Sequence, residues 1–455
     1  MPTALLWFRR DLRLADHPAL LAACEAAGAD GTVLPVFVFD ERLYGPSGEP
    51  RRRFLQDCLA ELDRSVGGAL VRRTGDPAAG LPALVAEVGA GSVHVTADAG
   101  PYGRRRDQAV ERALGDVPLV RTGSPYAVAP GRVTKRDGTP FQVFSPFSRA
   151  WREHGWHSPA VRPDVVPWLT GVRSDDPPPL PDLGDVRLPP AGEAAAQQAW
   201  QSFRDERLLG YAEGRNTPGT DGTSRLSAYL KYGCIHPRTL LADLAGEEGS
   251  EAVRRYTDEL AWRDFYADVL WHRPDSARQY LNPQLQGMDH DTGPEAEALV
   301  RAWETGRTGF PIVDAGMRQL LGEAYVHNRV RMIVASFLVK DLHQEWTRGA
   351  RYFMQHLVDG DLASNNHGWQ WVAGSGTDAS PYYRVFNPIT QGKKFDPDGV
   401  YVKKWVPELR DLDARYVHEP WTAPGGVPAG YPQPVVDHAH ERQVSLDRYA
   451  AVRAR

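Results

Sequence analysis

The chain has 455 residues, which is too long for one ordinary hydrophobic core, so we expect two or more domains. Its net charge of −5 argues against a generally basic nucleic-acid binder, so any nucleic-acid site must be a local basic surface. Three widely spaced cysteines (Cys24, Cys58 and Cys234) form no disulfide framework and no metal motif. The first residues show no signal peptide or membrane span, and we therefore expect a cytoplasmic protein without a metal site.

The first part of the chain alternates short β-rich runs with helical patterns. The predicted strands cover residues 4–8, 32–39, 69–72, 92–96 and 117–122, and the predicted helices cover 18–26, 51–66, 78–88 and 102–114. Apolar strands separated by helices predict a parallel sheet with right-handed crossovers, in a Rossmann-like α/β domain over residues 1–128. No GxGxxG follows the first strand, so the usual dinucleotide fingerprint is missing.

The remainder of the chain divides into two parts. Residues 129–192 are dense in Pro and Gly, as in DDPPPLPDLGDVRLPP, and we expect a long interdomain linker in which stable helices or strands are absent. From residue 193 to 455 the strand signal disappears, and helical patterns cover 251–271, 294–304, 312–321, 328–342 and 346–357. This part is predicted to be a large, almost all-α domain.

Four groups of residues carry chemistry beyond what a fold needs. In the first, Glu259, Trp262, Arg263 and Tyr266 are spaced i, i+3, i+4, i+7 and share one face of a helix. A carboxyl, an indole, a guanidinium and a phenol make a poor apolar core. A functional site and an amphipathic helix with a solvated polar face are equally compatible with this spacing.

The second group lies in HNRVRMIVASFLV, where Asn328, Arg331 and Met332 share a helix face beside Arg329. Arginines in so hydrophobic a segment need an anionic partner, because a buried unpaired charge is costly. That partner belongs either to a structural salt bridge or to a ligand-binding site, and the segment alone does not separate the two.

The third and fourth groups sit at predicted helix starts. In DGDLASNNHGWQW, Asp359 and Asp361 suit helix capping, but two Asn and two Trp exceed what a cap needs, and Asn365 and Trp369 face the same way. In GTSRLS, hydroxyls and free amides form a potential anion site, with a plain capping motif as the alternative.

Seven segments stand in the order and spacing of one family: WFRRDLRLADHPAL, GTSRLSAYL, ELAWRDFY, TGFPIVDAGMRQL, HNRVRMIVASFLVKDL, DGDLASNN and GWQW. From about Leu5 to about Trp421 the chain resembles the photolyase/cryptochrome family, and within it the class I photolyases of cyclobutane pyrimidine dimers. The resemblance implies an α/β antenna domain, a helical domain that holds U-shaped FAD, and light-driven repair of UV-damaged DNA.

The resemblance also assigns the residues that would hold FAD. They are Tyr211, Thr223, Ser224, Arg225, Leu226, Ser227, Tyr256, Arg331, Asp359, Asp361 and Asn365. Asp359 is expected to pair with Arg331, and Asn365 would face N5 of the flavin, where a neutral amide can accept a hydrogen bond from the reduced form. Plant cryptochromes typically carry Asp at the matching position, so Asn365 favours repair over sensing.

Lesion recognition is implied for a second set of residues. The expected contacts to the dimer or to DNA are Arg215, Glu259, Trp262, Arg263, Tyr266, Asn328, Arg329, Met332, Trp371, Gln391 and Lys393. The dimer is unreachable inside a duplex and must be flipped out; photolyases are themselves a standard example of this rule. Glu259, Asn328, Met332 and Asn365 would stand closest to the chemistry, and Glu259 is expected to stabilise the dimer anion radical by donating a hydrogen bond.

Two further functions follow from the resemblance. Trp369 and Trp346 match the first two members of the family's photoreduction chain, while the position of the third falls near Gly293 and Pro294. Either another aromatic residue completes the chain or photoreduction is inefficient. DAGPYGRRRD resembles the deazaflavin-type members, with Asp98, Arg51 and Lys231 as antenna contacts. We expect 8-hydroxy-5-deazaflavin as the antenna; methenyltetrahydrofolate or an empty site are the alternatives.

The main alternative function is a cryptochrome-like blue-light sensor without repair activity, which would share the fold and FAD. A soluble flavin electron-transfer protein would leave Glu259, Trp262 and Asn328 unexplained. His367 departs from the family, in which many members have Gly before GW, and we assign it no role in proton transfer. The family also leads us to expect a monomer.

Overall fold

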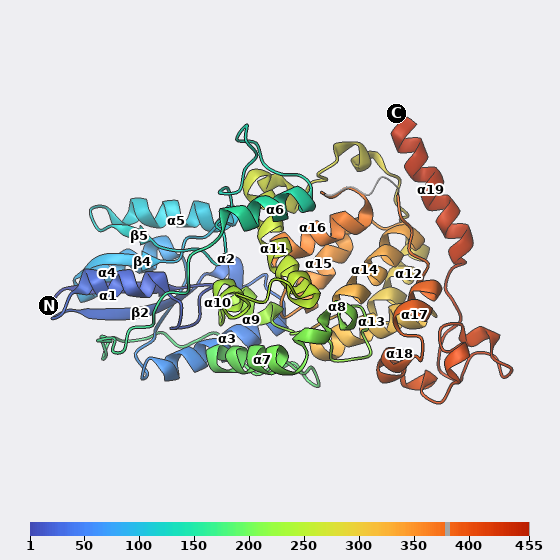
Figure 1. Ribbon diagram of the computed structural model, residues 1–455, viewed down its shortest axis with the longest axis horizontal. Coiled ribbons are helices and arrows are strands. Elements are labelled where there is room, and N and C mark those ends of the chain that lie inside the picture. Colours follow the sequence, from blue (N-terminus) through green and yellow to red (C-terminus); the bar gives the residue numbers. More distant parts are fainter. Residues whose placement is uncertain (378–382, 455) are drawn as a thin grey trace.

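The computed structural model describes residues 1–377 and 383–454. Its N-terminal part is a five-stranded parallel sheet in the order β3-β2-β1-β4-β5, with helices packed on it (Figure 1). The strands are β1 (Thr3–Phe8), β2 (Thr32–Phe39), β3 (Val71–Thr74), β4 (Ala90–Val95) and β5 (Leu119–Arg121), and the helices are α1 (Pro18–Ala27), α2 (Glu41–Tyr44), α3 (Glu49–Ser65), α4 (Pro77–Val88) and α5 (Pro101–Leu114). The α/β prediction is confirmed, with element ends shifted by one or two residues in most cases.

The central strands explain why the sequence pattern was easy to interpret. Every residue of β1 is buried, and so is every residue of β2 after Thr32. A strand covered by helices on both faces is apolar along its whole length, as in other parallel sheets. The chain leaves the carboxyl end of β1 at Arg9 and Arg10. Arg10 reaches the helical part of the molecule, where it contacts Asp361 and the carbonyl oxygen of Lys231, whereas Arg9 pairs with Asp107 of α5.

The segment between the two parts departs from expectation. Helix α6 (Phe144–His154) forms inside the predicted linker and packs against α11 (Glu251–His272). Phe144, Phe147 and Trp151 are buried along one face of α6, a helical spacing that the surrounding Pro and Gly residues obscured. The prediction that residues 129–192 lack helices was therefore wrong at α6, and the domain boundaries remain a prediction.

Asp264 in the middle of α11 fixes this connecting segment to the helical part. Its Oδ2 accepts hydrogen bonds from the amide N–H of Val128 at 2.9 Å and from Nε1 of Trp151 at 3.0 Å. Burial raises the pKa of Asp264 to about 6, although these donors and Arg263 oppose the shift. A carboxylate buried at this position is tolerated because the connecting segment supplies its donors.

From residue 192 onward the described chain is helical. The helices are α7 (Gly192–Glu206), α8 (Tyr211–Gly214), α9 (Ser227–Tyr232), α10 (Pro237–Asp243), α11, α12 (Pro294–Glu304), α13 (Pro311–Glu323), α14 (Asn328–Ser336), α15 (Trp346–His356), α16 (Leu362–Ala373), α17 (Pro388–Phe395), α18 (Val400–Trp405) and α19 (His438–Ala454). Short 3-10 turns span Leu208–Gly210, Pro274–Ala277, Pro283–Gly287, Pro407–Leu409, Ala414–Tyr416 and Pro420–Thr422. The predicted large helical part is confirmed.

One helix prediction needs correction. The predicted helix over 328–342 is α14 followed by a π-helical turn, Phe337–Asp341. In this turn Lys340 is buried, and its ammonium donates to the carbonyl oxygen of Arg384 and lies 4.1 Å from the ring centre of Tyr383. The buried lysine thus lies in a π-helical turn, where its amine has a hydrogen-bond partner, and not on a regular apolar helix face.

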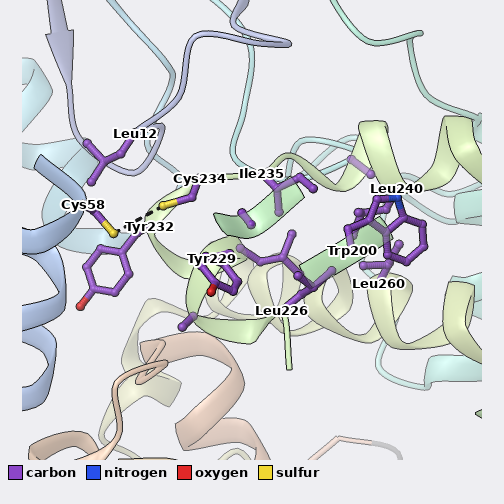
Figure 2. Packing of buried hydrophobic residues seen from close by; sticks show 14 of the residues in the cluster. Leu12, Cys58, Trp200, Leu226, Tyr229, Tyr232, Cys234, Ile235, Leu240 and Leu260 are labelled. Atoms are coloured by element: carbon purple, nitrogen blue, oxygen red, sulfur yellow. Dashed lines mark hydrogen bonds between the residues drawn. The ribbon is translucent and has the colours of Figure 1, made fainter. Parts of the chain in front are cut away.

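The two parts share a continuous hydrophobic core. One cluster of buried side chains runs from β1 and α3 into α9 and α11. Figure 2 shows part of it, where Cys58 of α3 and Cys234 after α9 are in contact with their sulfur atoms 3.6 Å apart. None of the helices described is long and apolar enough to cross a membrane.

Candidate functional site: a cavity between the helices

A cavity of about 520 Å³ lies among the helices of the C-terminal part. It is bounded by α8, the loop before α9, α11, α14, α15 and α16. Of the residues singled out in the sequence, those that line it are Tyr211, Arg215, Thr223, Ser224, Arg225, Leu226, Ser227, Lys231, Tyr256, Glu259, Trp262, Arg263, Tyr266, Asn328, Arg329, Arg331, Met332, Asp359, Asp361, Asn365, Trp369 and Trp371. The structure thus gathers residues from all four groups around one space.

The GTSRLS loop forms a polar wall of the cavity. The hydroxyl of Tyr256 donates to Oγ of Ser224 at 3.1 Å, which fixes the loop to α11. Arg225 has a φ of +51°, in the left-handed region that non-glycine residues rarely adopt, and its guanidinium is held by Glu323 at 3.1 Å. The loop is therefore held in a shape that presents hydroxyls and amides to the cavity.

Arg331 and Asp359 form the ion pair that the sequence predicted. Nη2 of Arg331 lies 2.7 Å from Oδ2 of Asp359, and Nε donates to the carbonyl oxygen of Val326 at 2.7 Å. The other carboxylate oxygen, Oδ1 of Asp359, is buried and has no hydrogen-bond partner among the described residues. An orphaned buried acceptor on a cavity wall fits a polar ligand group that donates to it.

Asp361 lies at one end of the cavity, next to the α/β part. Its Oδ2 is 2.8 Å from Nη2 of Arg10 and 3.9 Å from Nζ of Lys231, and its Oδ1 caps α16 through the amide of Ser364. Burial alone would raise the pKa of Asp361, but Arg10, Lys231 and Arg263 together hold it well below its usual range. Burial and the neighbouring Arg10 lower the pKa of Lys231 to about 7.

Glu259 lies on another part of the cavity wall, beside Arg215 and Arg329. Burial raises the pKa of its carboxyl, and the guanidinium of Arg215, 2.5 Å away, opposes this without cancelling it. Arg329 is held in place from two sides: Asn216 accepts from its Nη2 at 2.6 Å, and its guanidinium carbon lies 4.5 Å from the ring centre of Phe395. This part of the wall combines a carboxyl whose pKa is raised by burial with two positioned cations, Arg215 and Arg329.

Aromatic rings line the wall next to Glu259. Trp262 stacks on Phe144 with ring centres 3.8 Å apart and planes at 6°, and Tyr266 lies 5.3 Å from Trp262. His367 packs beneath Tyr266 at 5.6 Å and is hydrogen-bonded to Oγ of Ser276 at 2.8 Å. Burial lowers the pKa of His367 to about 4, so it is a neutral packing residue at pH 7.

Asn365 presents a defined group to the cavity. Its Nδ2 donates to the carbonyl oxygen of Ala350 at 3.1 Å and to Oδ1 of Asn366 at 2.8 Å. With both amide hydrogens engaged, the carbonyl oxygen is the group that can serve a ligand, and it can only accept. This orientation agrees with the predicted acceptor for N5–H of a reduced flavin.

Five predicted residues lie outside the cavity wall: Arg51, Asp98, Trp346, Gln391 and Lys393. Arg51 donates to the carbonyl oxygen of Met354 at 2.6 Å, and Asp98 lies 3.2 Å from Nη2 of Arg106. Gln391 and Lys393 are on α17, which also carries Phe395, and Lys393 pairs with Glu419. Trp346 is fully buried on α15.

Sequence reasoning missed part of the cavity wall and its neighbours. The missed lining residues are Leu230, Leu260, Tyr325, Val326, Ala335, Phe353, Leu357, Gly360, Ser364, Gly368 and Val372. Many follow from helical spacing, since Ser364, Gly368 and Val372 are four apart on α16. Arg10 was also missed, although its place directly after an apolar strand was a usable signal.

The fold and the cavity define a two-part protein with an α/β domain and a helical domain shaped for a large polar cofactor. The family described as "DNA photolyase" matches residues 4–164, and that described as "FAD binding domain of DNA photolyase" matches residues 256–451. A curated Streptomyces griseus protein named deoxyribodipyrimidine photo-lyase is 40% identical, over 97% of this chain and 98% of its own. The chain belongs to the DNA photolyase family.

Solved structures agree with this assignment. A bacterial class III photolyase from Agrobacterium tumefaciens matches with a TM-score of 0.93 and 38% identity, covering 100% of this chain and 98% of its own. A cryptochrome from Synechocystis matches with a TM-score of 0.87 and 26% identity, covering 98% of this chain and 99% of its own. The fold is common to both groups, and the sequence is more similar to the photolyase.

Proposed function

We propose that this protein is a light-driven DNA-repair enzyme that splits cyclobutane pyrimidine dimers with reduced FAD. The observation that carries the proposal is the single cavity that unites the expected cofactor residues with the expected lesion residues. A flavin electron-transfer protein has no need of Glu259, Trp262 and Asn328 in the same space. The name of the Streptomyces relative supports the same activity.

The residues present fit FAD. Ser224 and its neighbours would hold the pyrophosphate, Asp359 and Asp361 the flavin edge and ribityl chain, and Asn365 the region of N5. The unsatisfied Oδ1 of Asp359 and the accepting oxygen of Asn365 both suit donors of a reduced isoalloxazine. When bound and excited by light, FADH⁻ supplies one electron to the dimer and receives it back after the two C–C bonds have broken.

The chain's own residues bind and orient the dimer. The free face of Trp262, together with Trp371, offers an apolar surface for the pyrimidine rings, and Met332 fills space beside them. Protonated Glu259 donates a hydrogen bond to a dimer carbonyl, where negative charge develops, while Asn328 bonds the other edge. Arg215 and Arg329, with Gln391 and Lys393 farther out on α17, form the local basic surface for the DNA backbone.

The test is a repair assay. Photoreduced protein is mixed with UV-damaged oligothymidylate and illuminated with blue light, and recovery of thymine absorbance is compared with a dark control. We expect recovery only in the light. No recovery from protein with bound, reduced FAD would overturn the proposal and favour the cryptochrome-like sensor.

We keep the finer assignments as proposals: class I, a deazaflavin antenna, a monomer and a cytoplasmic location. The class III relative is a competing class assignment. For the antenna, Arg51 and Lys231 both lie close enough to Asp361 to feel its charge, and Arg10 links Asp361 to Asp98 electrostatically. Extraction of the bound chromophore tests this cluster: deazaflavin supports it, and methenyltetrahydrofolate contradicts it.

Trp369 is proposed as the first electron donor to the flavin, with Trp346 next. Trp369 lines the cavity, and its ring packs directly against Gly349, three residues after Trp346 on α15. We expect a Trp369→Phe variant to bind FAD normally and to lose photoreduction of the oxidised flavin. Normal photoreduction in this variant would refute the chain.

A further inference from the structure

The aromatic chain beyond Trp346 has no third tryptophan at the expected position, but it has a tyrosine in contact. The ring of Tyr280 lies edge-on to Trp346, with centres 6.1 Å apart. Tyr280 stands between two short 3-10 turns, Pro274–Ala277 and Pro283–Gly287, and is 9% exposed, whereas Trp346 is 1% exposed. The contact therefore leads from the core to its margin.

Trp346 on α15 lies one helical turn from Gly349, the residue of α15 that the Trp369 ring of α16 touches. Trp346, Gly349, Ala350 and Phe353 form the buried face of α15 against α16, and the ring of Trp369 touches Gly349. Three helical residues span about 4.5 Å along the axis. A Cβ on Gly349 would lie 2.1 Å from the Trp369 ring, so only glycine permits this approach of α15.

The hydroxyl of Tyr280 has a base as its partner. It is hydrogen-bonded to Nε2 of His290 at 3.3 Å, and His290 is half-buried. Burial lowers the pKa of His290, so the imidazole is neutral at pH 7 and can accept a proton, although Glu345 opposes the shift. Burial likewise raises the pKa of Tyr280, and Glu345 adds to that shift. Glu345 therefore stabilises positive charge on the Tyr280–His290 pair.

We propose that Tyr280 is the terminal electron donor of the photoreduction chain and that His290 takes its phenolic proton. This rests on the proposed function, since the electron acceptor is the photoexcited oxidised flavin. One electron passes from Trp369 to the flavin, Trp346 refills Trp369, and Tyr280 refills Trp346. Loss of the O–H proton to Nε2 of His290 leaves a neutral tyrosyl radical and an imidazolium. An external thiolate then gives one electron to the tyrosyl radical and becomes a thiyl radical, while the imidazolium proton returns to the phenolic oxygen and restores both Tyr280 and neutral His290.

A second aromatic route starts from the same Trp369 and supplies a matched control. Trp303 lies 6.2 Å from Trp369, and Tyr352 lies 5.4 Å from Trp303. The hydroxyl of Tyr352, however, donates to the backbone carbonyl oxygen of Glu304 at 2.8 Å. A carbonyl oxygen is a very weak base and cannot take the proton, and His356 packs on the Tyr352 ring, with ring centres 4.3 Å apart, while the hydroxyl is bonded to Glu304 instead. Oxidation of Tyr352 would therefore leave a charged radical in a partly buried place. The structure therefore favours Tyr280.

The experiment uses FAD-loaded, oxidised protein frozen after blue-light illumination without added reductant, and measures the electron paramagnetic resonance spectrum. We expect a tyrosyl radical in the wild type, its loss in Tyr280→Phe, and its retention in Tyr352→Phe. His290→Gln keeps a hydrogen-bonding side chain without a base and should also lose the signal. FAD content and melting temperature of each variant establish that it is folded.

The outcomes separate this inference from the proposed function. A signal that survives in Tyr280→Phe, disappears in Tyr352→Phe, or is absent from the wild type overturns the role of Tyr280. If Trp369→Phe still forms reduced flavin at the normal rate, the whole chain is wrong. Loss of the radical in Tyr280→Phe and His290→Gln alone, with Trp369→Phe inactive in photoreduction, supports the assignment.

Discussion

Two partly buried carboxyl groups on the cavity wall, Asp361 and Glu259, stand in opposite electrostatic environments. Asp361, next to the α/β part, is surrounded by Arg10, Lys231 and Arg263, and its pKa lies well below the usual range. Glu259 pairs with Arg215 and lies near Arg329, and its pKa is raised because burial outweighs their attraction. The cations around each carboxyl thus decide whether its pKa is lowered or raised relative to the usual value.

This difference matches the two tasks of the site. A carboxylate that stays ionised can only accept hydrogen bonds, which suits the hydroxyls and N–H groups of a bound cofactor. A carboxyl whose pKa is raised is more readily protonated, and in that form it can donate to an oxygen on which negative charge develops. The same cavity thereby offers a hydrogen-bond acceptor, Asp361, for the cofactor and a hydrogen-bond donor, the protonated form of Glu259, for the lesion.

The largest effect is expected from removing the negative charge of Asp361. Asp361→Asn removes the counter-ion of the partly buried Arg10 and Lys231, so we expect a loss of stability below the roughly 3–5 kcal/mol that breaking a fully buried ion pair costs. We expect lower free energy of unfolding in urea and loss of FAD on gel filtration. Because the pKa of Asp361 is depressed, its stabilising contribution is present at neutral pH and falls as the pH drops toward the folded-state pKa.

The matched control for this variant is Asp398→Asn, which changes an exposed aspartate. It should leave both the urea midpoint and FAD content unchanged. Equal behaviour of the two variants would show that the cluster around Asp361 contributes nothing special.

A smaller effect is expected from a substitution of Glu259. Glu259→Gln keeps a donor, so we expect repair quantum yield and lesion affinity to fall by no more than about tenfold, the equivalent of one modest hydrogen bond. In the wild type, repair should decline as the pH rises through the elevated pKa of Glu259, because the donor is lost. In Glu259→Gln that decline should disappear, and a variant with full yield, full affinity and an unchanged pH profile would contradict the role of Glu259.

The smallest effect is a shift of this pH profile. Arg215→Met removes the cation that lowers the pKa of Glu259, so the decline in repair should move to higher pH. DNA affinity should fall as well, whereas the exposed Arg301→Met should alter neither quantity. A shift to lower pH would mean that another group governs the profile.

Residue types and spacing predicted much of this site. Helical periodicity placed Glu259, Trp262 and Tyr266 on one face, and the hydrophobic segment around Arg331 indicated an anionic partner. The family resemblance, rather than the residue pattern, named Asp359 as that partner. The sequence did not predict Asn216 against Arg329 or Arg10 against Asp361, because these contacts join segments far apart in the chain. Register along one element is local information, whereas such contacts depend on how the elements pack.

The same distinction explains the error at α6. Dense Pro and Gly hid the helical spacing of Phe144 and Trp151, and the stability of α6 comes from its contact with α11 rather than from its own propensity. The π-helical turn at Phe337–Asp341 was missed for a related reason. Its buried Lys340 is hydrogen-bonded to the carbonyl oxygen of Arg384, which lies 44 residues later in the sequence, so the residues of the helix do not indicate this partner.

The attachment of the connecting segment to Asp264 has a consequence for how the molecule folds. The bond from Val128 to Asp264 spans 136 residues, and that from Trp151 spans 113. Contacts this distant in sequence close large loops, which slows their formation. During synthesis the connecting segment emerges before α11. The sheet face covered by α4 and α5 can therefore complete its core early, whereas the core shared with α9 and α11 closes together with the junction, near the end of folding.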